Sequence, residues 1–209
     1  MILHLFPALD QMDAPTTIWL IQHGLTDGAD DRCCGCYNVR LSADGIRQAK
    51  AIAARLGSES ISNFYSSCLS RAIETARIVV EPHGRPFQTL DELAEMNFGD
   101  LDGLRYEEIQ EHYPEIFQSW MTRPTETRFP NGESFTEMKA RVLGALDLLL
   151  FRHRNQSIAI VTHAGVIRLI LAQALCIPDN QIFRLAQHHG AINRIDYFDQ
   201  GPVVKLMNG

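Results

Sequence analysis

The feature that most constrains the fold of this 209-residue chain is the alternation of short apolar runs with longer amphipathic stretches. The runs have the length of buried strands, and the stretches between them repeat apolar residues at helical spacing. Strands are predicted at 18–21, 63–66 and 157–161, with a closing hairpin at 192–197 and 203–207, and helices near 43–56, 69–80, 133–150 and 164–175. This alternation predicts an α/β fold, a three-layer α/β/α arrangement with a mostly parallel central sheet.

The length fits a single domain over residues 1–209. Residues 1–15 are expected to form a short N-terminal extension. The stretch from about 91 to 131 has a weaker pattern, because glycines and prolines interrupt it. We expect short helices and loops there, forming an insertion over the active site.

Composition limits the partners of the chain. The formal net charge of -6 argues against nucleic acid, which needs a basic surface, but it allows a small positive pocket for a phosphorylated molecule. No apolar run reaches the roughly 18 residues of a membrane span. Residues 1–9 lack the basic start and the cleavage site of a signal peptide. The five cysteines are an odd number with three bunched together, so we expect a cytoplasmic protein; a homodimer is left open.

Two histidines follow predicted strands in matching contexts. In each case an apolar strand leads to a polar residue and then to a histidine, His23 or His163, with glycine one or two positions later. The carboxyl ends of parallel strands meet at one edge of a sheet, where ligands bind in folds of this class. A single histidine after a strand is usually structural, but two in the same context predict a shared site.

A third strand end leads into the helix that carries Arg71. A guanidinium at this edge can hold two phosphate oxygens at once. The alternative is a surface arginine that pairs with Glu74 or Glu108, a contact worth little.

Six motifs follow one another along the chain. They are LIQHGLT at 20–26, LSADGIRQA at 41–49, SSCLSRAIETA at 66–76, LAEMNFGD at 93–100, NGESF at 131–135 and VTHAGVIR at 161–168. With these motifs in this order, the chain resembles the histidine phosphatase superfamily, also called the phosphoglycerate mutase-like family. The match covers most of the chain, from about residue 17 to 170.

The resemblance implies a metal-independent phosphatase without a cofactor. His23 would be the nucleophile that forms a phosphohistidine, and His163 and Arg71 would bind the phosphoryl oxygens. Glu95 would protonate the leaving group and then activate water, with Glu92 as a nearby competitor. The residues expected to bind the substrate are Gln22, Gly24, Thr26, Arg32, Gly35 and Ala164.

The chain departs from the family at Gln22, where other members usually carry arginine. Glutamine keeps hydrogen-bonding groups but lacks the charge and the two-pronged fork. Loss of one transition-state donor costs on the order of 2–4 kcal/mol. Arg32, in the following loop, is a candidate to compensate.

Within the family, the segments 91–100 and 131–135 are most similar to α-ribazole phosphatases, which function in cobalamin biosynthesis. The expected substrate is therefore a small phosphomonoester, with α-ribazole 5′-phosphate as a candidate, and a mutase is disfavoured. The alternative is a catalytically weakened phosphate-binding or regulatory protein, because of Gln22.

The remaining cysteines and histidines receive simpler interpretations. Cys33, Cys34 and Cys36 resemble zinc or copper ligands but lack a second ligand pair, so no metal site is predicted. The Gln-His-His-Gly stretch at 187–190 is placed at the rim of the pocket. The histidines expected at the surface are His4, His83, His112 and His153.

Overall fold

The computed structural model describes residues 14–28 and 31–209. The predicted extension at 1–15 lies almost wholly outside the described residues. Residues 1–9, which lack the features of a signal peptide, lie entirely outside them. The strands are β1 (Thr16–Gln22), β2 (Asn63–Ser67), β3 (Phe87–Leu90), β4 (Ser157–Thr162), β5 (Ile192–Phe198) and β6 (Gly201–Leu206). The α-helices are α1 (Ala43–Leu56), α2 (Ser70–Val80), α3 (Tyr106–His112), α4 (Pro114–Thr122), α5 (Phe135–Arg152) and α6 (Ala164–Ala174).

The strands form one six-stranded sheet in the order β3-β2-β4-β1-β5-β6. The strands β1, β2, β3 and β4 run parallel to one another. The strand β5 runs antiparallel to both β1 and β6. The strands β1 and β4, which precede the two predicted histidines, are direct neighbours, with Gln22 opposite Thr162. The parallel arrangement therefore brings both histidines to the same edge of the sheet.

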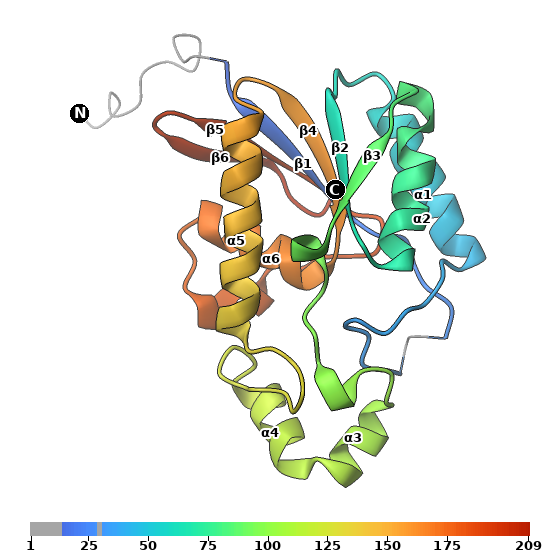
Figure 1. The fold of residues 1–209 in the computed structure, drawn as a ribbon, viewed down its shortest axis with the longest axis vertical. Coiled ribbons are helices and arrows are strands. Elements are labelled where there is room, and N and C mark those ends of the chain that lie inside the picture. Colours follow the sequence, from blue (N-terminus) through green and yellow to red (C-terminus); the bar gives the residue numbers. More distant parts are fainter. Residues whose placement is uncertain (1–13, 29–30) are drawn as a thin grey trace.

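Helices cover both faces of the sheet, with α1 and α2 on one side and α5 and α6 on the other (Figure 1). Alternate residues of β1 show why. Ile18 and Leu20 pack in the core cluster that holds the apolar faces of α5 and α6, whereas Trp19 and Ile21 pack in the cluster of α1 and α2. Successive side chains of a strand point to opposite faces, so a strand buried on both sides reads as a continuous apolar run. The predicted three-layer α/β/α fold is confirmed.

Local sequence sets the helix ends close to their predicted positions. The Ser42 hydroxyl accepts from the Gly45 amide at the start of α1, as an N-cap does. Ile46 lies at helical spacing from the buried Ala49 and Ala53, which predicts a buried side chain, but it is 40% exposed. The long helix α5 begins at Phe135, two residues later than predicted, because Ser134 and Glu137 form a capping box there.

The strand β3 was not predicted from the sequence. It pairs with β2 at the edge of the sheet, and its Gln88 and Thr89 are exposed. An edge strand of this kind lacks the continuous apolar run by which central strands are recognised.

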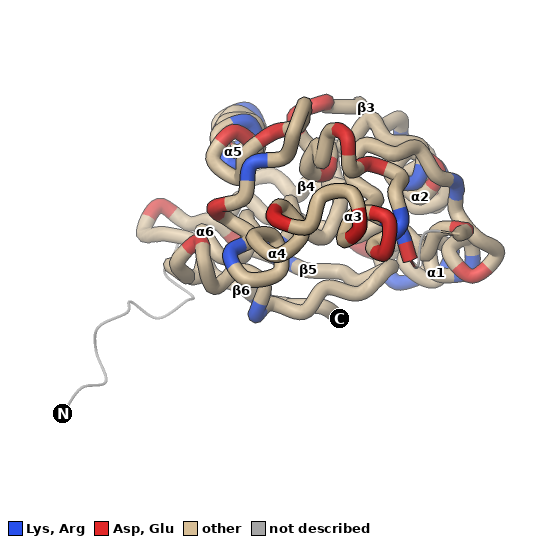
Figure 2. The backbone as a smooth tube through the Cα atoms, turned by 90° about the horizontal axis from the view of Figure 1, so that it is seen from below, with Lys and Arg blue, Asp and Glu red and all other residues tan. Residues whose placement is uncertain are grey.

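The segment from about 91 to 131 lies beyond the carboxyl ends of the parallel strands, where it contains α3 and α4 (Figure 1). It has an aromatic cluster of its own, in which the Phe98 ring lies 4.9 Å from Trp120 and 4.8 Å from Phe129. The view from this end shows several acidic residues on α3 (Figure 2).

Two of the histidines expected at the surface lie elsewhere. His153 is buried, and its Nε2 lies 2.7 Å from the Tyr65 hydroxyl in the core. The expectation of a surface residue is wrong because this histidine, just after α5, packs under β2 rather than outward. His83 is half-buried against the Phe64 ring at 4.8 Å, while His112 is exposed as expected. His4 lies outside the described residues.

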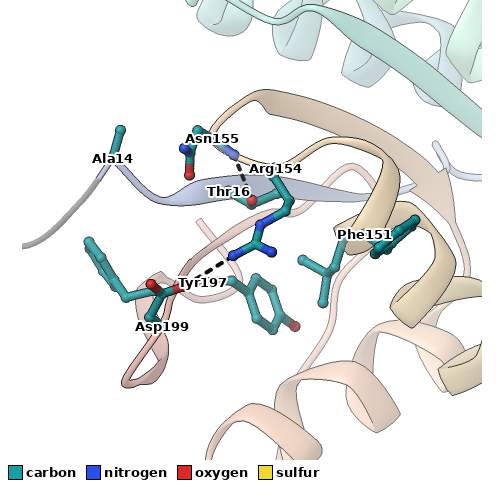
Figure 3. A pocket seen from close by; sticks show the side chains of 9 residues that line it. Ala14, Thr16, Phe151, Arg154, Asn155, Tyr197 and Asp199 are labelled. Atoms are coloured by element: carbon teal, nitrogen blue, oxygen red, sulfur yellow. Dashed lines mark hydrogen bonds and ion pairs between the residues drawn. The ribbon is translucent and has the colours of Figure 1, made fainter.

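A cavity of about 370 Å³ lies at the amino end of β1, beside Thr16 (Figure 3). It is bordered by an ion pair of 3.5 Å between Arg154 and Asp199. Beside it, the backbone amide of Asn155 donates to the Thr16 hydroxyl. None of its described lining residues is a histidine, so it lacks the chemistry predicted for the other end of the sheet. None of the described helices is long and apolar enough to cross a membrane.

Candidate active site

The structure brings the two predicted histidines together at the carboxyl ends of β1 and β4. The backbone amide of His23 donates to the Thr162 carbonyl, and the rings of His23 and His163 are 5.1 Å apart, edge to face. The two residues are separated by 140 positions in the chain, so only the pairing of β1 with β4 makes them neighbours.

The hydrogen bonds of His23 define which ring nitrogen faces the site. Nδ1 lies 2.8 Å from the Gly24 carbonyl, which can only accept, so Nδ1 carries the proton. Nε2 therefore has a free electron pair, and the Arg71 Nε–H group donates to it at 3.1 Å. This orientation presents a nucleophilic nitrogen beside a cation.

His163 is held from its other side. Its Nε2 lies 2.7 Å from the Ser67 hydroxyl, which itself accepts from the Leu69 amide, so the hydroxyl hydrogen is free to point at Nε2. When the hydroxyl donates to Nε2, the ring carries its proton on Nδ1, which has no hydrogen-bond partner among the described residues. His163 is 0% exposed and does not line the cavity that His23 borders.

Both imidazoles are held in the neutral form. Burial, and then the charge of Arg71, lower the pKa of His23 well below its usual 6.5. The same two causes, in the same order, lower the pKa of His163. A neutral imidazole is the form that acts as a nucleophile near pH 7.

Arg71 is only 2% exposed, which excludes the alternative of a surface ion pair. Glu74 instead accepts from the Leu41 amide, and Glu108 accepts from the Arg105 amide. Besides its contact with His23, the guanidinium donates to the carbonyl groups of Cys34, Gly35 and Tyr37. The loop after β1 is therefore wrapped around the Arg71 side chain.

Glu95 comes from the 91–131 segment and faces the same site. One carboxylate oxygen accepts from the Gly165 amide at 3.0 Å, near the start of α6, and the other accepts from its neighbour Met96. The main chain around Glu95 is held by Arg141, which donates to the carbonyl groups of Ala94 and Glu95. Glu92, the competing acid, accepts from Arg141 through its main-chain carbonyl group. It does not line the cavity.

A cavity of about 360 Å³ opens at this site. Its lining includes eight residues that the sequence had singled out, namely Gln22, His23, Thr26, Arg71, Glu95, Ala164 and, at the rim, Gln187 and His189. It also includes Cys34. The histidine-rich stretch at 187–190 signalled this rim, whereas nothing in the sequence marked Cys34 as a lining residue.

Three residues expected to bind substrate do not line the cavity. Gly24 donates its amide to the Thr75 hydroxyl and packs so closely on Gly45 that a Cβ would clash. The Gly35 amide donates to Asp102, and Arg32 donates to the Gly103 carbonyl at 2.7 Å. Arg32 therefore does not replace the arginine that Gln22 displaces, because its guanidinium is directed into the 91–131 segment.

The clustered cysteines have different environments. Cys33 is buried, Cys34 borders the cavity, and Cys36 is exposed, and all are free thiols. Burial raises the pKa of Cys34, and burial and Asp102 raise that of Cys36 to about 11, so neither is a thiolate at neutral pH. The part of the chain that the structure describes contains no group of three or more His, Cys, Asp or Glu side chains suited to a metal ion.

Comparison with known proteins identifies the class of enzyme that this fold and site define. The sequence model of the histidine phosphatase superfamily (branch 1) matches residues 18–209, so the chain belongs to that superfamily. Its membership confirms the resemblance drawn from the six motifs and supports phosphatase activity.

Individual relatives carry several phosphatase names. A metal-independent phosphoserine phosphatase of Arabidopsis thaliana is 35% identical over 159 residues, or 74% of this chain and 67% of the relative. The adenosylcobalamin/α-ribazole phosphatase of Escherichia coli is 29% identical, covering 91% of this chain and 95% of the relative. The crystal structure of the α-ribazole phosphatase from Shigella flexneri superimposes with a TM-score of 0.86 at 28% identity, over 93% of this chain and 96% of the other.

Proposed function

We propose that this chain hydrolyses a small phosphomonoester by transferring the phosphoryl group to His23 Nε2 and then to water, without a metal ion. The observation that carries the proposal is the orientation of His23, whose unprotonated Nε2 meets the Arg71 guanidinium at the cavity. The nucleophile and the cation that would bind the phosphoryl oxygens are thus already adjacent.

The two half-reactions use the groups that border the cavity. In the first, the electron pair of Nε2 forms a P–N bond as the ester P–O bond breaks, and the leaving oxygen takes a proton from Glu95. Gly24 stabilises the imidazolium that results, because its carbonyl group accepts from Nδ1–H. In the second, Glu95 takes a proton from water, the water oxygen bonds to phosphorus, and the P–N electron pair returns to Nε2.

The proposed charge stabilisation comes from the protein. Arg71 supplies the cation, and a small approach of the substrate toward His163 would let its Nδ1–H group donate to a phosphoryl oxygen. Phosphoryl transfer depends mainly on alignment and on positive charge near the equatorial oxygens. Side chains can meet both needs here, and the name of the Arabidopsis relative supports metal independence.

The proposed substrate is α-ribazole 5′-phosphate, on the strength of the bacterial α-ribazole phosphatases that match nearly the full chain. Phosphoserine is the competing substrate because of the plant relative. We propose that the 91–131 segment, which supplies Glu95, lies over the bound substrate and selects its leaving group. The proposed location is the cytoplasm, where five free thiols are kept reduced.

The test is a labelling and turnover experiment in the presence of EDTA. Wild-type protein incubated with a ³²P-labelled phosphomonoester is expected to acquire a label that acid releases and base does not, as a phosphohistidine does. His23→Ala should acquire none and should not turn over. Equal hydrolysis by both proteins, or activity lost with EDTA and restored by a metal ion, would contradict the proposal.

Substrate identity is tested by comparing kcat/KM for α-ribazole 5′-phosphate, phosphoserine and a sugar phosphate. We expect the first to be the highest. A higher value for phosphoserine would reject the α-ribazole assignment and leave the mechanism intact.

A second candidate function is a phosphate-binding or regulatory protein with weakened catalysis. It is favoured by Gln22, which lines the cavity without the charge of the family's arginine. Wild-type protein without turnover of p-nitrophenyl phosphate, together with activity gained in Gln22→Arg, would establish this function instead.

A further inference from the structure

Gln22 presents an unsatisfied hydrogen-bond acceptor to the active-site cavity. Its side chain is 4% exposed and lines the cavity beside His23, at the end of β1. Oε1 has no hydrogen-bond partner among the described residues. Buried polar atoms are almost always paired, so an acceptor without a protein partner at a cavity is available to a donor that enters with water or with the ligand.

The missing partner must be a donor, since a carbonyl oxygen can only accept. A fully ionised phosphate ester offers only acceptor oxygens, which would repel Oε1. A singly protonated phosphate carries one P–OH group, which can donate. The acceptor on Gln22 therefore distinguishes the two ionisation states of a phosphate ester.

The charges around Gln22 favour the same ionisation state. Arg71, on α2, is the cation of the cavity lining, and three of its donor hydrogens are already bound to main-chain carbonyls of the loop after β1. Glu95, from the 91–131 segment, lines the same cavity and adds no positive charge whether it is protonated or ionised. With His23 held neutral, Arg71 is the one Lys or Arg side chain among the described lining residues, and a single cation matches a monoanion more closely than a dianion.

The other titratable groups near this position come from four further elements. They are His163 at the end of β4, Cys34 in the loop after β1, His189 before β5, whose ring is 5.3 Å from that of His23, and, behind the lining, Asp102 and Arg141. His189 is exposed and sits at the rim.

We propose that this site binds its substrate as the phosphate monoanion, with Gln22 Oε1 accepting a hydrogen bond from the P–OH group. The inference rests on the proposed function and adds the ionisation state of the substrate to it. The replacement of arginine by Gln22 would then be a change of preferred substrate form rather than a loss of activity.

The test uses two alkyl phosphates, one with electron-withdrawing fluorines that lower its second phosphate pKa. We expect kcat/KM of the wild type to fall above that pKa with a slope of about -1 on logarithmic axes, and the fall to shift to lower pH for the fluorinated ester. A fall at the same pH for both esters would assign it to an enzyme group such as Glu95, and no fall would mean that the dianion is accepted. Either result overturns the inference.

Two variants test the part played by Gln22. Gln22→Arg supplies a cation and should flatten the alkaline fall, raising the ratio of kcat/KM at pH 8 to that at pH 6 by about tenfold or more. Gln22→Met keeps the length of the side chain without an acceptor, and should lower kcat/KM at pH 6 by about tenfold. Its Tm should be no lower than that of the wild type, because a buried unpaired acceptor is removed. An unchanged pH ratio in Gln22→Arg would overturn the inference.

Failure of the inference is separable from failure of the proposed function. Hydrolysis that is lost in His23→Ala supports the phosphohistidine mechanism whatever the pH profile shows. If His23→Ala hydrolyses the esters as fast as the wild type, the mechanism itself is wrong and the inference falls with it.

Discussion

The ends of β1 and β4 have nearly the same sequence layout, yet the ring nitrogens of their two histidines have different hydrogen-bond partners. In His23 the Nδ1 proton is donated to the Gly24 carbonyl, and Nε2 accepts from the Arg71 Nε–H group at the cavity. In His163 it is Nε2 that is bound within the fold, by the Ser67 hydroxyl, and Nδ1 has no partner among the described residues.

The difference shows that two histidines in matching sequence contexts can be oriented for two roles. The role depends on which nitrogen the surrounding backbone and hydroxyl groups have already engaged. His23 lines the cavity and is proposed as the nucleophile, whereas His163 is fully buried and is proposed as a hydrogen-bond donor. The predictions below test this asymmetry, beginning with the largest expected effect.

Removing each imidazole in turn should give unequal losses. His23→Ala removes the nucleophile, so kcat should fall by about 10⁴-fold or more. His163→Ala removes one donor to the phosphoryl group, and the loss should be about 10²- to 10³-fold, with phosphoenzyme still detectable. Turnover of p-nitrophenyl phosphate and ³²P labelling measure the two effects. Phosphoenzyme in His23→Ala and none in His163→Ala would reverse the assignment.

The acid that serves the nucleophilic side is tested by Glu95→Gln. For an alkyl ester, which needs a protonated leaving group, we expect kcat to fall by about 10²- to 10⁴-fold. An aryl ester leaves without that proton, so the variant should form phosphoenzyme rapidly and then hydrolyse it slowly. Rapid-quench kinetics would show this burst. Equal losses for both esters, without a burst, would exclude Glu95 as the acid; Glu92→Gln is the matched control and should behave as the wild type.

The hydroxyl that orients His163 is tested by Ser67→Ala. Nε2 then loses its partner and the ring loses its preference for the Nδ1–H form. We expect kcat to fall by about tenfold and the free energy of unfolding by about 1 kcal/mol. A readout specific to orientation is the ¹⁵N chemical shift of the two ring nitrogens, which reports the tautomer.

Ser66→Ala is the matched control for that experiment. Ser66 is equally buried, but its hydroxyl donates to the carbonyl group of Ser67 and does not contact the histidine. It should lose stability to a similar extent while kcat and the ¹⁵N shifts of His163 stay unchanged. Identical behaviour of the two variants would show that the hydroxyl of Ser67 has no orienting role.

The last prediction concerns stability as a function of pH rather than catalysis. Because the pKa of each histidine is lowered on folding, the unfolded chain binds more protons at acidic pH. The stabilisation is fully present above the unfolded value of about 6.5 and declines as pH falls below it, by up to about 1.4 kcal/mol per pH unit for each histidine. Urea unfolding between about pH 4 and 8 measures this, and His163→Gln should reduce the slope. A slope unchanged in that variant would contradict the burial argument.

Much of the fold was predictable because its signals are local. The runs that became β1, β2 and β4 are apolar on both faces, and the caps at Ser42 and Ser134 are short-range hydrogen bonds. The edge strand β3 and the buried position of His153 were not predictable, since neither leaves a periodic pattern. For His153, the deciding contact is with Tyr65, 88 positions away.

The sequence by itself determined which chemical groups share one edge of the sheet. Two histidines and an arginine that follow parallel strands must lie at the same edge, because the carboxyl ends of parallel strands lie together. Only the tertiary structure decided what each group can do there. The Ser67 hydroxyl reaches His163 across 96 positions, Arg32 donates to the Gly103 carbonyl, and Gln22 Oε1 has no partner within the described part of the chain. The physical reason is that a hydrogen bond depends on direction as well as on composition, and its direction is set by groups far away in the chain.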